Sequence, residues 1–270
     1  MQRKRLRTVW LLVLLLAAAC STVPITGRQQ LNLIPQDTIM SMSAQQYNQF
    51  LEQNKLSNNT EAARTIQNVG RDIAGAVEQY MRQNNMSQQV EGYEWEFKLV
   101  EDDQINAFAM PGGKVVVYTG ILDVTKGNAG LATVMGHEVA HAIANHGGER
   151  MSQGLLAQFG GVALSQALKT KPGATQQMFM AAYGVGAQVG VLLPYSRLQE
   201  TEADKLGLVF MAMAGYDPRE AVSFWQRMSS AKEGGAPPEF LSTHPADQTR
   251  IRNLQNMLPE AMRYYKPGTR

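Results

Sequence analysis

Apolar residues recur at intervals of three and four positions between Thr60 and Gln83. They are Ile66, Val69, Ile73, Val77 and Tyr80. This spacing places them on one face of an α-helix, and Asn84-Asn85 directly after the run favour a helix end there. The pattern predicts a surface helix that packs one face on a core.

A second segment alternates between apolar and polar positions. Its apolar members are Tyr93, Trp95, Phe97 and Leu99. Period two is typical of a strand with one buried face. Asn106 to Met110 and Lys114 to Tyr118 lie on either side of the turn at Pro111-Gly112-Gly113 and predict two more strands. We therefore expect a small antiparallel sheet beside helices.

Helical patterns dominate the rest of the chain. Asn128 is a candidate cap for a helix from Ala129 to about Asn145, which ends before Gly147-Gly148. Leu198 to Ala214 has helical spacing and ends at Gly215. Asp217-Pro218 then opens another helix, as its cap and first residue. The fold class that these patterns predict is α+β and mainly helical.

The stretch from Met151 to Leu193 is rich in Gly, Ala and Gln and is broken near Lys171-Pro172-Gly173. Glutamines interrupt its apolar runs, so a pair of membrane-spanning helices is not expected. We interpret residues 151–193 as a helical lid over a functional site.

The N-terminus carries the pattern of an export signal. Arg3, Lys4, Arg5 and Arg7 precede an apolar run, and three alanines follow that run. From Val9 to Ala19 there are 11 residues, fewer than the roughly 20 that a membrane-spanning helix needs. Residues 1–19 are therefore predicted to be a signal peptide.

Cys20 follows the alanines directly, as in bacterial lipoprotein signals, and is the predicted lipidation site through which the chain meets the membrane. Residues 20–36, with Pro24, Gly27 and Pro35, are predicted to form a tether, and folded structure is expected from about Asp37 to residue 270. Ser21, in place of Asp, resembles lipoproteins sorted to the outer membrane. The predicted location is the periplasmic face of that membrane.

Composition limits the chemistry that the chain can support. Cys20 is the only cysteine, so no internal disulfide forms and a metal bound by the domain must use nitrogen and oxygen ligands. The net charge of +2 is 25 minus 23, and without the four N-terminal basic residues it is about −2. This balance offers no electrostatic case for binding nucleic acid.

One segment of the predicted helix from Ala129 has the spacing of a zinc site. In His137-Glu138-Val139-Ala140-His141 the two histidines are four residues apart, so they lie on the same helix face and both imidazoles can bind one zinc ion. Zinc lowers the pKa of a water molecule towards about 7, and Glu138 can take the proton as a zinc-activated water attacks a peptide carbonyl. The motif predicts hydrolysis with one zinc ion per chain.

Catalytic zinc has three protein ligands, and the third must come from another segment. His146 follows His141 by five residues, which does not fit the long motif with a third histidine. Glu200 and Asp204 lie one helical turn apart, and Glu200 is the candidate ligand. Glu202 competes with Glu200, but two residues on a helix turn the side chain by about 200°, so only one of the two faces the metal.

Three motifs in order give the chain a resemblance to the zinc metallopeptidase family that includes HtpX, LoiP, BepA and the CAAX prenyl proteases. They are Gly136 to His141, Glu200 to Asp204, and His244-Pro245 followed by Arg250, over about residues 60–255. The chain is most similar to the periplasmic lipoprotein members. The resemblance implies a gluzincin-type domain in which Glu200 binds zinc and Asp204 supports a histidine ligand. It also implies His244 as a donor to the oxyanion and Arg250 as a brace for the carboxylates.

The resemblance extends to Asn106, Ala107 and Phe108, where the family's strand beside the active helix pairs with an extended substrate. A purely structural edge strand with Phe108 in the core is the alternative.

The function that the resemblance implies is a metalloendopeptidase acting on unfolded or misfolded envelope proteins. The alternative is a chaperone-like factor that works with the machinery assembling outer-membrane proteins and holds a latent or structural zinc. Cleavage of prenylated peptides is not expected, because it needs several membrane spans.

Overall fold

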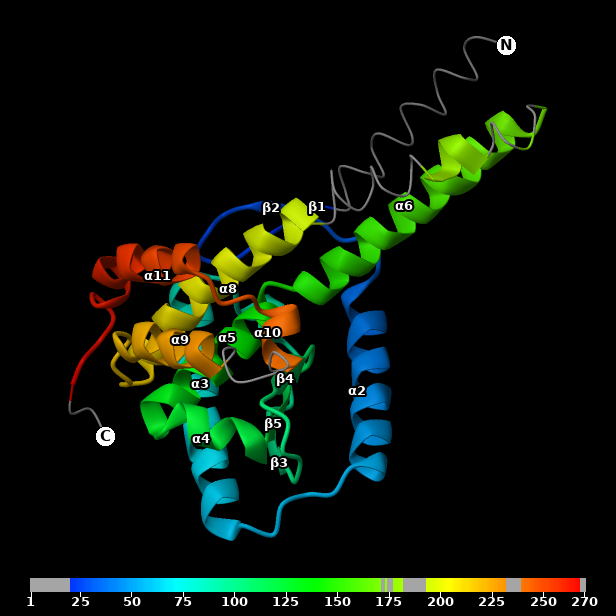
Figure 1. The fold of residues 1–270 in the computed structure, drawn as a ribbon. Helices are drawn as coiled ribbons and strands as arrows, with labels where there is room; N and C mark the ends of the chain where they lie inside the picture. Colours follow the sequence, from blue (N-terminus) through cyan, green and yellow to red (C-terminus); the bar gives the residue numbers. More distant parts are fainter. Residues whose placement is uncertain (1–19, 171–172, 174–176, 182–192, 232–238, 268–270) are drawn as a thin grey trace. The chain divides into compact units, whose positions relative to one another are not determined.

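The computed structural model describes residues 20–170, 173, 177–181, 193–231 and 239–267 (Figure 1). The polypeptide divides into two compact units, one of residues 1–39 and 145–198, the other of residues 40–144 and 199–270. The predicted signal peptide lies outside the described residues. Among the described helices, none combines the length and apolar character needed to cross a membrane.

The first unit contains a short hairpin and a long helix. The elements are β1 (Cys20–Thr22), β2 (Gln29–Leu31) and α6 (His146–Leu168), together with the ends of α2 (Gln36–Gln53) and α8 (Leu193–Met213). The two terminal nitrogens of the Arg28 guanidinium, Nη1 and Nη2, donate to the Glu149 carboxylate at 2.7 and 2.8 Å. Glu149 is buried, so this ion pair fixes the hairpin to the start of α6.

The hairpin differs from the prediction that folded structure begins near Asp37. β1 pairs with β2 from Cys20 to Thr22, Val23 is fully buried, and Val23 N donates to Arg28 O at 2.8 Å. Strands of three residues are too short to give a periodic signal, which is why the sequence pattern predicted only a tether here.

Helix α6 forms the first part of the predicted lid. Leu156, Phe159 and Val162 expose 43%, 65% and 55% of their surface, so one side of α6 is apolar and uncovered in its own unit. Parts of the remaining stretch, residues 171–172, 174–176 and 182–192, lie outside the described residues. The lid stays a prediction.

The second unit holds the sheet and the remaining helices. They are α3 (Thr60–Gln83), η1 (Ser87–Val90), β3 (Glu96–Val100), β4 (Ala107–Met110), β5 (Lys114–Tyr118), η2 (Thr119–Ile121), α4 (Leu122–Thr125), α5 (Asn128–Ile143), α9 (Glu220–Ala231), α10 (Glu239–Thr243) and α11 (Gln248–Ala261), with most of α2 and α8.

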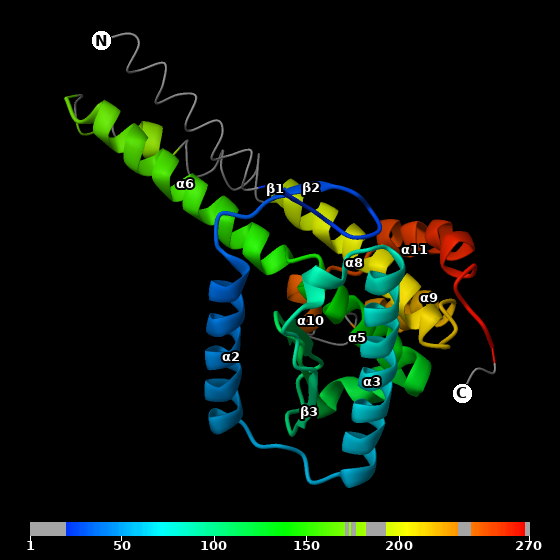
Figure 2. The ribbon, with the colours of Figure 1, turned by 180° about the vertical axis from the view of Figure 1, so that it is seen from behind.

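Helix α3 has the predicted bounds. The side chain of Asn59 caps it by accepting a hydrogen bond from Ala62 N at 3.0 Å, and the five predicted apolar positions are buried. At Gly70 a Cβ would come within 2.3 Å of the Phe97 ring, so the missing side chain lets β3 pack against α3. The two elements lie side by side in both views (Figures 1 and 2).

The sheet has the strand order β3-β5-β4. β4 and β5 are antiparallel, as expected, whereas β3 joins β5 in parallel, because the chain crosses from β3 to β4 before it returns through β5. The predicted class, a mainly helical α+β fold with a small sheet, is confirmed.

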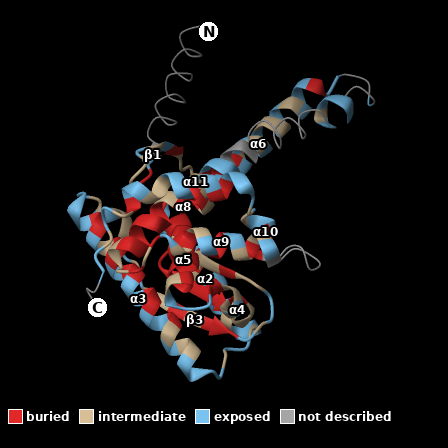
Figure 3. Ribbon diagram, turned by 60° about the vertical axis from the view of Figure 1, so that its left-hand side comes forward, coloured by how far each residue is buried: buried red, intermediate tan, exposed pale blue. Residues whose placement is uncertain are grey.

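Helix α5 is the centre of this unit. All its residues from Gly130 to Ile143 are buried (Figure 3), and it contacts α3, α4, α9, β4 and β5. Its cap is Gly127, not the predicted Asn128. A Cβ at Gly130 would lie 2.0 Å from the Thr125 carbonyl oxygen. The first turn of α5 therefore packs directly on the end of α4.

Candidate active site

The two histidines of α5 point to one place. Their Nε2 atoms are 3.1 Å apart, and both rings are buried, with 2% of His137 and 7% of His141 exposed. A helix that is apolar on all sides forms only inside a core. The fold therefore places this motif away from bulk water.

Glu200 reaches the same place from α8. Its carboxylate oxygens lie 3.4 Å from His137 Nε2 and 3.2 Å from His141 Nε2. His244, which follows α10, brings Nδ1 within 3.2 Å of His137 Nε2 and 2.9 Å of the Glu200 carboxylate. Among the described residues, these four form the group whose donor atoms all lie within 4.8 Å of one another.

The donor atoms fit a zinc ion. Donors at the corners of a tetrahedron lie about 3.3 Å apart when each bond to zinc is about 2.05 Å long. The contacts of His137 and His141 with each other and with Glu200 measure 3.1 to 3.4 Å. Two imidazoles and a carboxylate are also a ligand set that zinc accepts in hydrolases. The site fits the metal in both chemistry and spacing.

Glu138 lies beside the cluster as a buried carboxylate. It exposes 4% of its surface, and its Oε1 has no hydrogen-bond partner among the described residues. The same oxygen lies 3.5 Å from His244 Nε2. A buried polar atom without a partner is costly, so this oxygen is placed for a group that arrives with substrate or water.

Asp204 lies on the Nδ1 side of the His137 ring, and Arg250 contacts Asp204. Asp204 Oδ1 lies 3.0 Å from His137 Nδ1, and a hydrogen bond there leaves Nε2 free as a metal ligand. Arg250 donates to both oxygens of Asp204, at 2.9 and 2.6 Å, and to Glu200 Oε2 at 3.1 Å. One guanidinium thus contacts both carboxylates, and the bracing role expected for Arg250 stays a prediction.

Burial and hydrogen bonds set the protonation of the ligands. Burial and the charge of Arg250 lower the pKa of His137, but hydrogen bonds to Asp204 and Glu200 outweigh them and raise it to about 9. Burial raises the pKa of Glu200, but hydrogen bonds with the three histidines hold that pKa far below its ordinary value. Without metal, His137 therefore carries a proton that metal binding must displace.

The pKa of Glu138 shifts in the other direction. Burial raises it, and the cationic neighbours His244 and His137 oppose that rise only in part. A carboxylate with a raised pKa is better matched to taking and returning a proton near neutral pH. Glu138 is therefore the group in the site best suited to acid–base work.

Trp225 is a site residue that the sequence analysis missed. It is buried in α9, the Arg250 guanidinium carbon lies 3.4 Å from its ring centre, and the His137 ring is 5.8 Å away. Cation–π contact of this kind holds the guanidinium in place. No spacing rule pointed to Trp225; the adjacent aromatic pair with Phe224 in a helical segment was the available signal.

Two glycines let α5 and α8 cross closely enough to bring the histidine pair and Glu200 together. A Cβ at Gly207 would lie 3.0 Å from His137 N, and one at Gly136 would lie 3.1 Å from Gly207 O. These neighbours are backbone atoms that cannot turn aside. The distance between the histidine pair and Glu200 therefore depends on Gly207 having no side chain.

Gly207→Ala is expected to lower the free energy of unfolding by about 1–3 kcal/mol, because the added methyl group overpacks the crossing. Zinc affinity should fall with it. Gly75→Ala is the matched control, since a Cβ there meets no atom within 4 Å, and it should raise stability by up to about 1 kcal/mol. Denaturant unfolding of the zinc-free proteins measures the stability of the two variants. Equal stability of Gly207→Ala and the parent protein would contradict the packing argument.

The predicted substrate strand lies at an edge of the sheet. β4 pairs only with β5 among the described strands and contacts α5, whereas the outer side of β3 is partly covered by a bridge between Leu56 and Val100. Ala107 is buried, Asn106 O accepts from Tyr118 N at 3.1 Å, and Phe108 packs against Phe50 with ring centres 5.1 Å apart. Phe108 thus serves the core, and the backbone of β4 remains the open edge.

The two residues that could have served instead as the third metal ligand, Glu202 and His146, lie outside the donor group. Glu202 is 4% exposed but is not among the clustered donors. His146 is the fully buried first residue of α6 and is not in the donor group either. Of the two glutamates, Glu200 is the one grouped with the histidines, and its role as a metal ligand stays a prediction.

Comparison with known proteins shows that the chain is similar to metallopeptidases. The family model described as "Peptidase family M48" matches residues 67–258. The chain is 38% identical over 177 residues to the mitochondrial metalloendopeptidase OMA1 of Schizosaccharomyces pombe, covering 62% of this chain and 48% of that protein. It is 30% identical over 247 residues to the human metalloendopeptidase OMA1, covering 89% and 46%. It is 29% identical over 171 residues to the beta-barrel assembly-enhancing protease of Escherichia coli, covering 59% and 34%. The chain spans about half the length of the two OMA1 relatives and about a third of the length of the Escherichia coli protein.

The predicted location on the outer membrane is contradicted, because relatives that match most of this chain are mitochondrial metalloendopeptidases. Basic residues without acidic ones occur both in secretory signals and in transit peptides. Arg3 to Arg7 therefore do not distinguish the two. Acylation of Cys20 depended on the same interpretation and stays an untested prediction.

Proposed function

Because this chain belongs to peptidase family M48, we propose that it is a zinc-dependent metalloendopeptidase. The observation that carries the proposal is the meeting of His137 Nε2, His141 Nε2 and the Glu200 carboxylate beside the buried Glu138, whose Oε1 has no hydrogen-bond partner among the described residues. We assign the first three as ligands of one zinc ion. Glu138 is the general base.

The division of labour among the residues follows from their surroundings. When bound, zinc supplies the Lewis acidity that polarises a carbonyl and lowers the pKa of water. Glu138, whose pKa is raised by burial, takes the proton of the attacking water and returns it to the leaving amine. Asp204 keeps His137 in the tautomer whose Nε2 is free, and Arg250 fixes Asp204.

His244 is proposed as the donor to the oxyanion. Its Nε2 lies 3.5 Å from Glu138 Oε1, which puts a ring N–H beside the place where the water attacks. Its Nδ1 contacts Glu200 at 2.9 Å, so the ring has an anchor on the other side. A preorganised donor of this kind stabilises the charge that develops on the carbonyl oxygen.

The proposed substrates are unfolded or misfolded proteins. The open edge of β4, next to α5, supports binding of an extended chain through main-chain hydrogen bonds, which only an unpaired segment can offer. The further expectation, that these substrates are envelope proteins, stays an untested prediction. The sequence alternative, an assembly factor with latent zinc, is retained because one relative is named a beta-barrel assembly-enhancing protease.

Removal and return of the metal tests the enzyme proposal. Dialysis against a chelator is expected to stop cleavage of casein, and one equivalent of zinc per chain should restore it, because the assigned ligands His137, His141 and Glu200 would hold a single ion. Metal content and cleavage are measured on the same samples. Cleavage that persists in the metal-free protein would refute the proposal, whereas zinc binding without cleavage would favour the assembly factor.

A further inference from the structure

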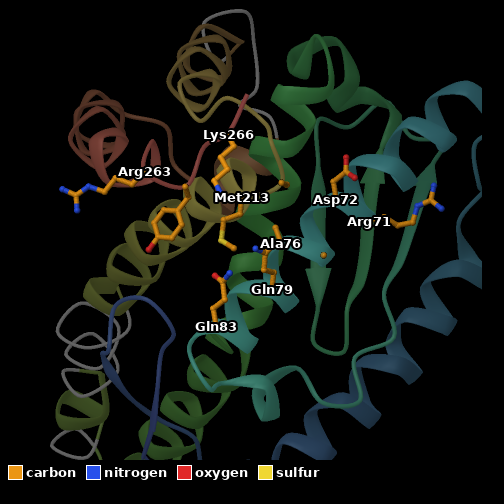
Figure 4. A pocket seen from close by; sticks show the side chains of 11 residues that line it. Arg71, Asp72, Ala76, Gln79, Gln83, Met213, Arg263 and Lys266 are labelled. Atoms are coloured by element: carbon orange, nitrogen blue, oxygen red, sulfur yellow. The ribbon is translucent and has the colours of Figure 1, made fainter. Parts of the chain in front are cut away.

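A second hollow of the catalytic unit contains no residue of the metal cluster. It is a groove of about 740 Å³ between α3, the end of α8 and the segment after α11 (Figure 4). Its lining residues include Arg71, Gln79, Gln83, Arg263 and Lys266. Figure 4 shows the two arginines at opposite ends of the lining, with their guanidinium groups directed away from each other, and Lys266 between them on the Arg263 side. Cations are thus spread along the groove.

The lining has a positive balance. Three of its residues are cationic, and Asp72 is the one carboxylate among them, so the lining charge is three minus one, or +2. The Asp72 carboxylate already accepts a hydrogen bond from Tyr216 Oη at 2.7 Å. Arg71 donates to the neutral Asn68 amide, and no carboxylate of the described residues forms an ion pair with it. The groove is suited to a ligand with carboxylates.

Gly75 lies in the lining, in the middle of α3, and the fold gives no reason for a glycine there. A Cβ at Gly75 would meet no atom within 4 Å, whereas one at Gly70 on the same helix would overlap the Phe97 ring. Glycine inside a helix costs about 1 kcal/mol relative to alanine. Its effect at position 75 is to leave the groove without a side chain at that point.

The dimensions and polar groups of the groove match an extended peptide. Its residues on α3 run from Arg71 to Gln83, which at 1.5 Å per residue is about 18 Å, the length of five or six residues of extended chain. Gln79 and Gln83 are exposed amides, and an amide both donates and accepts, as a peptide backbone does. A compact inorganic anion would use neither feature.

We propose that this groove binds an extended, acidic segment of a protein, with its carboxylates on Arg71, Arg263 and Lys266 and its backbone over Gly75. This binding site is separate from the metal ligands. Because its lining contains no residue of the metal cluster, it adds to the proposed peptidase a docking surface for a partner protein that carries an acidic segment.

The test uses the full chain with Glu138→Gln, so that a bound peptide stays uncut. Mass spectrometry of the peptide checks that it is intact. A fluorescent peptide of about eight residues with alternating Glu and Ala is titrated while its anisotropy is followed. Gly75→Phe and the double variant Arg263→Glu, Lys266→Glu should each weaken binding at least about tenfold. Binding should also weaken as salt is added.

Matched controls separate the groove from general effects. Gly154→Phe places the same ring at another helical glycine whose Cβ meets no atom within 4 Å, and Arg64→Glu reverses an exposed charge on α3 outside the groove. Both should bind the peptide within about twofold of the parent. Gly75→Ala should keep both fold and binding, which shows that α3 tolerates a side chain at this position.

Three results would overturn the proposal. They are equal binding of the peptide with Lys in place of Glu, undiminished binding by Gly75→Phe, and displacement of the peptide by tripolyphosphate at equal affinity, which would indicate a plain anion site. Because binding is measured without cleavage, these results do not depend on whether the chain proves to be a peptidase.

Discussion

Glu138→Gln is expected to abolish peptide cleavage, with kcat lowered about 10³-fold, while the protein keeps its zinc. Glutamine has the shape of glutamate but cannot take a proton from water. Glu138 is not one of the clustered donors, so its replacement leaves the three ligands intact. Casein cleavage and metal analysis on one preparation measure the two effects separately.

The fold should also survive this change. Glu138 is buried and its Oε1 has no partner among the described residues, so an amide there breaks no existing hydrogen bond of that oxygen. The melting temperature should match the parent protein, and Glu61→Gln, at an exposed position on α3, is the control for a lost charge. Undiminished cleavage by Glu138→Gln would rule out the general-base assignment; full rescue of a deletion strain by an inactive variant would favour the assembly factor.

Glu200→Ala is expected to weaken zinc binding more than about 100-fold, whereas Glu202→Ala should leave it nearly unchanged. The two glutamates are both on α8, but only Glu200 contacts the Nε2 atoms of His137 and His141. Competition with a fluorescent chelator measures the affinity of each variant. The pair distinguishes the assigned ligand from a more deeply buried acidic neighbour on the same helix.

Stability provides the second half of this comparison. Glu202 is 4% exposed, so its loss is expected to cost about 1–3 kcal/mol of unfolding free energy through its buried surroundings and not through zinc. Unfolding of the metal-free variants separates this cost from metal binding. Retention of zinc by Glu200→Ala, together with its loss in Glu202→Ala, would reverse the ligand assignment.

The parts of the fold that could be predicted are those governed by local pattern. Helix α3 has the predicted bounds because its apolar stripe and the asparagine cap act within a few residues of one another. Lys114 to Tyr118 forms β5 as predicted. His137 and His141 could be expected to meet because residues four apart on a helix share a face, and Glu138 directly follows His137.

Other features depended on contacts between distant segments. The parallel pairing of β3 with β5 is set by the path of the chain and not by the alternation within either strand. The contact of Trp225 with Arg250 joins two helices and has no signature in spacing. At the N-terminus the pattern itself was ambiguous, since the same basic residues suit more than one destination.

The close crossing at Gly136 and Gly207 also bears on when the metal is acquired during biosynthesis. Glu200 follows His141 by 59 residues, so a growing chain exposes the two imidazoles well before the carboxylate exists. Two imidazoles alone make an incomplete ligand set, and the third donor arrives only when α8 docks on α5. On the proposed assignment, zinc uptake is a late event, and the newly made protein cannot cut other chains before its own core has formed.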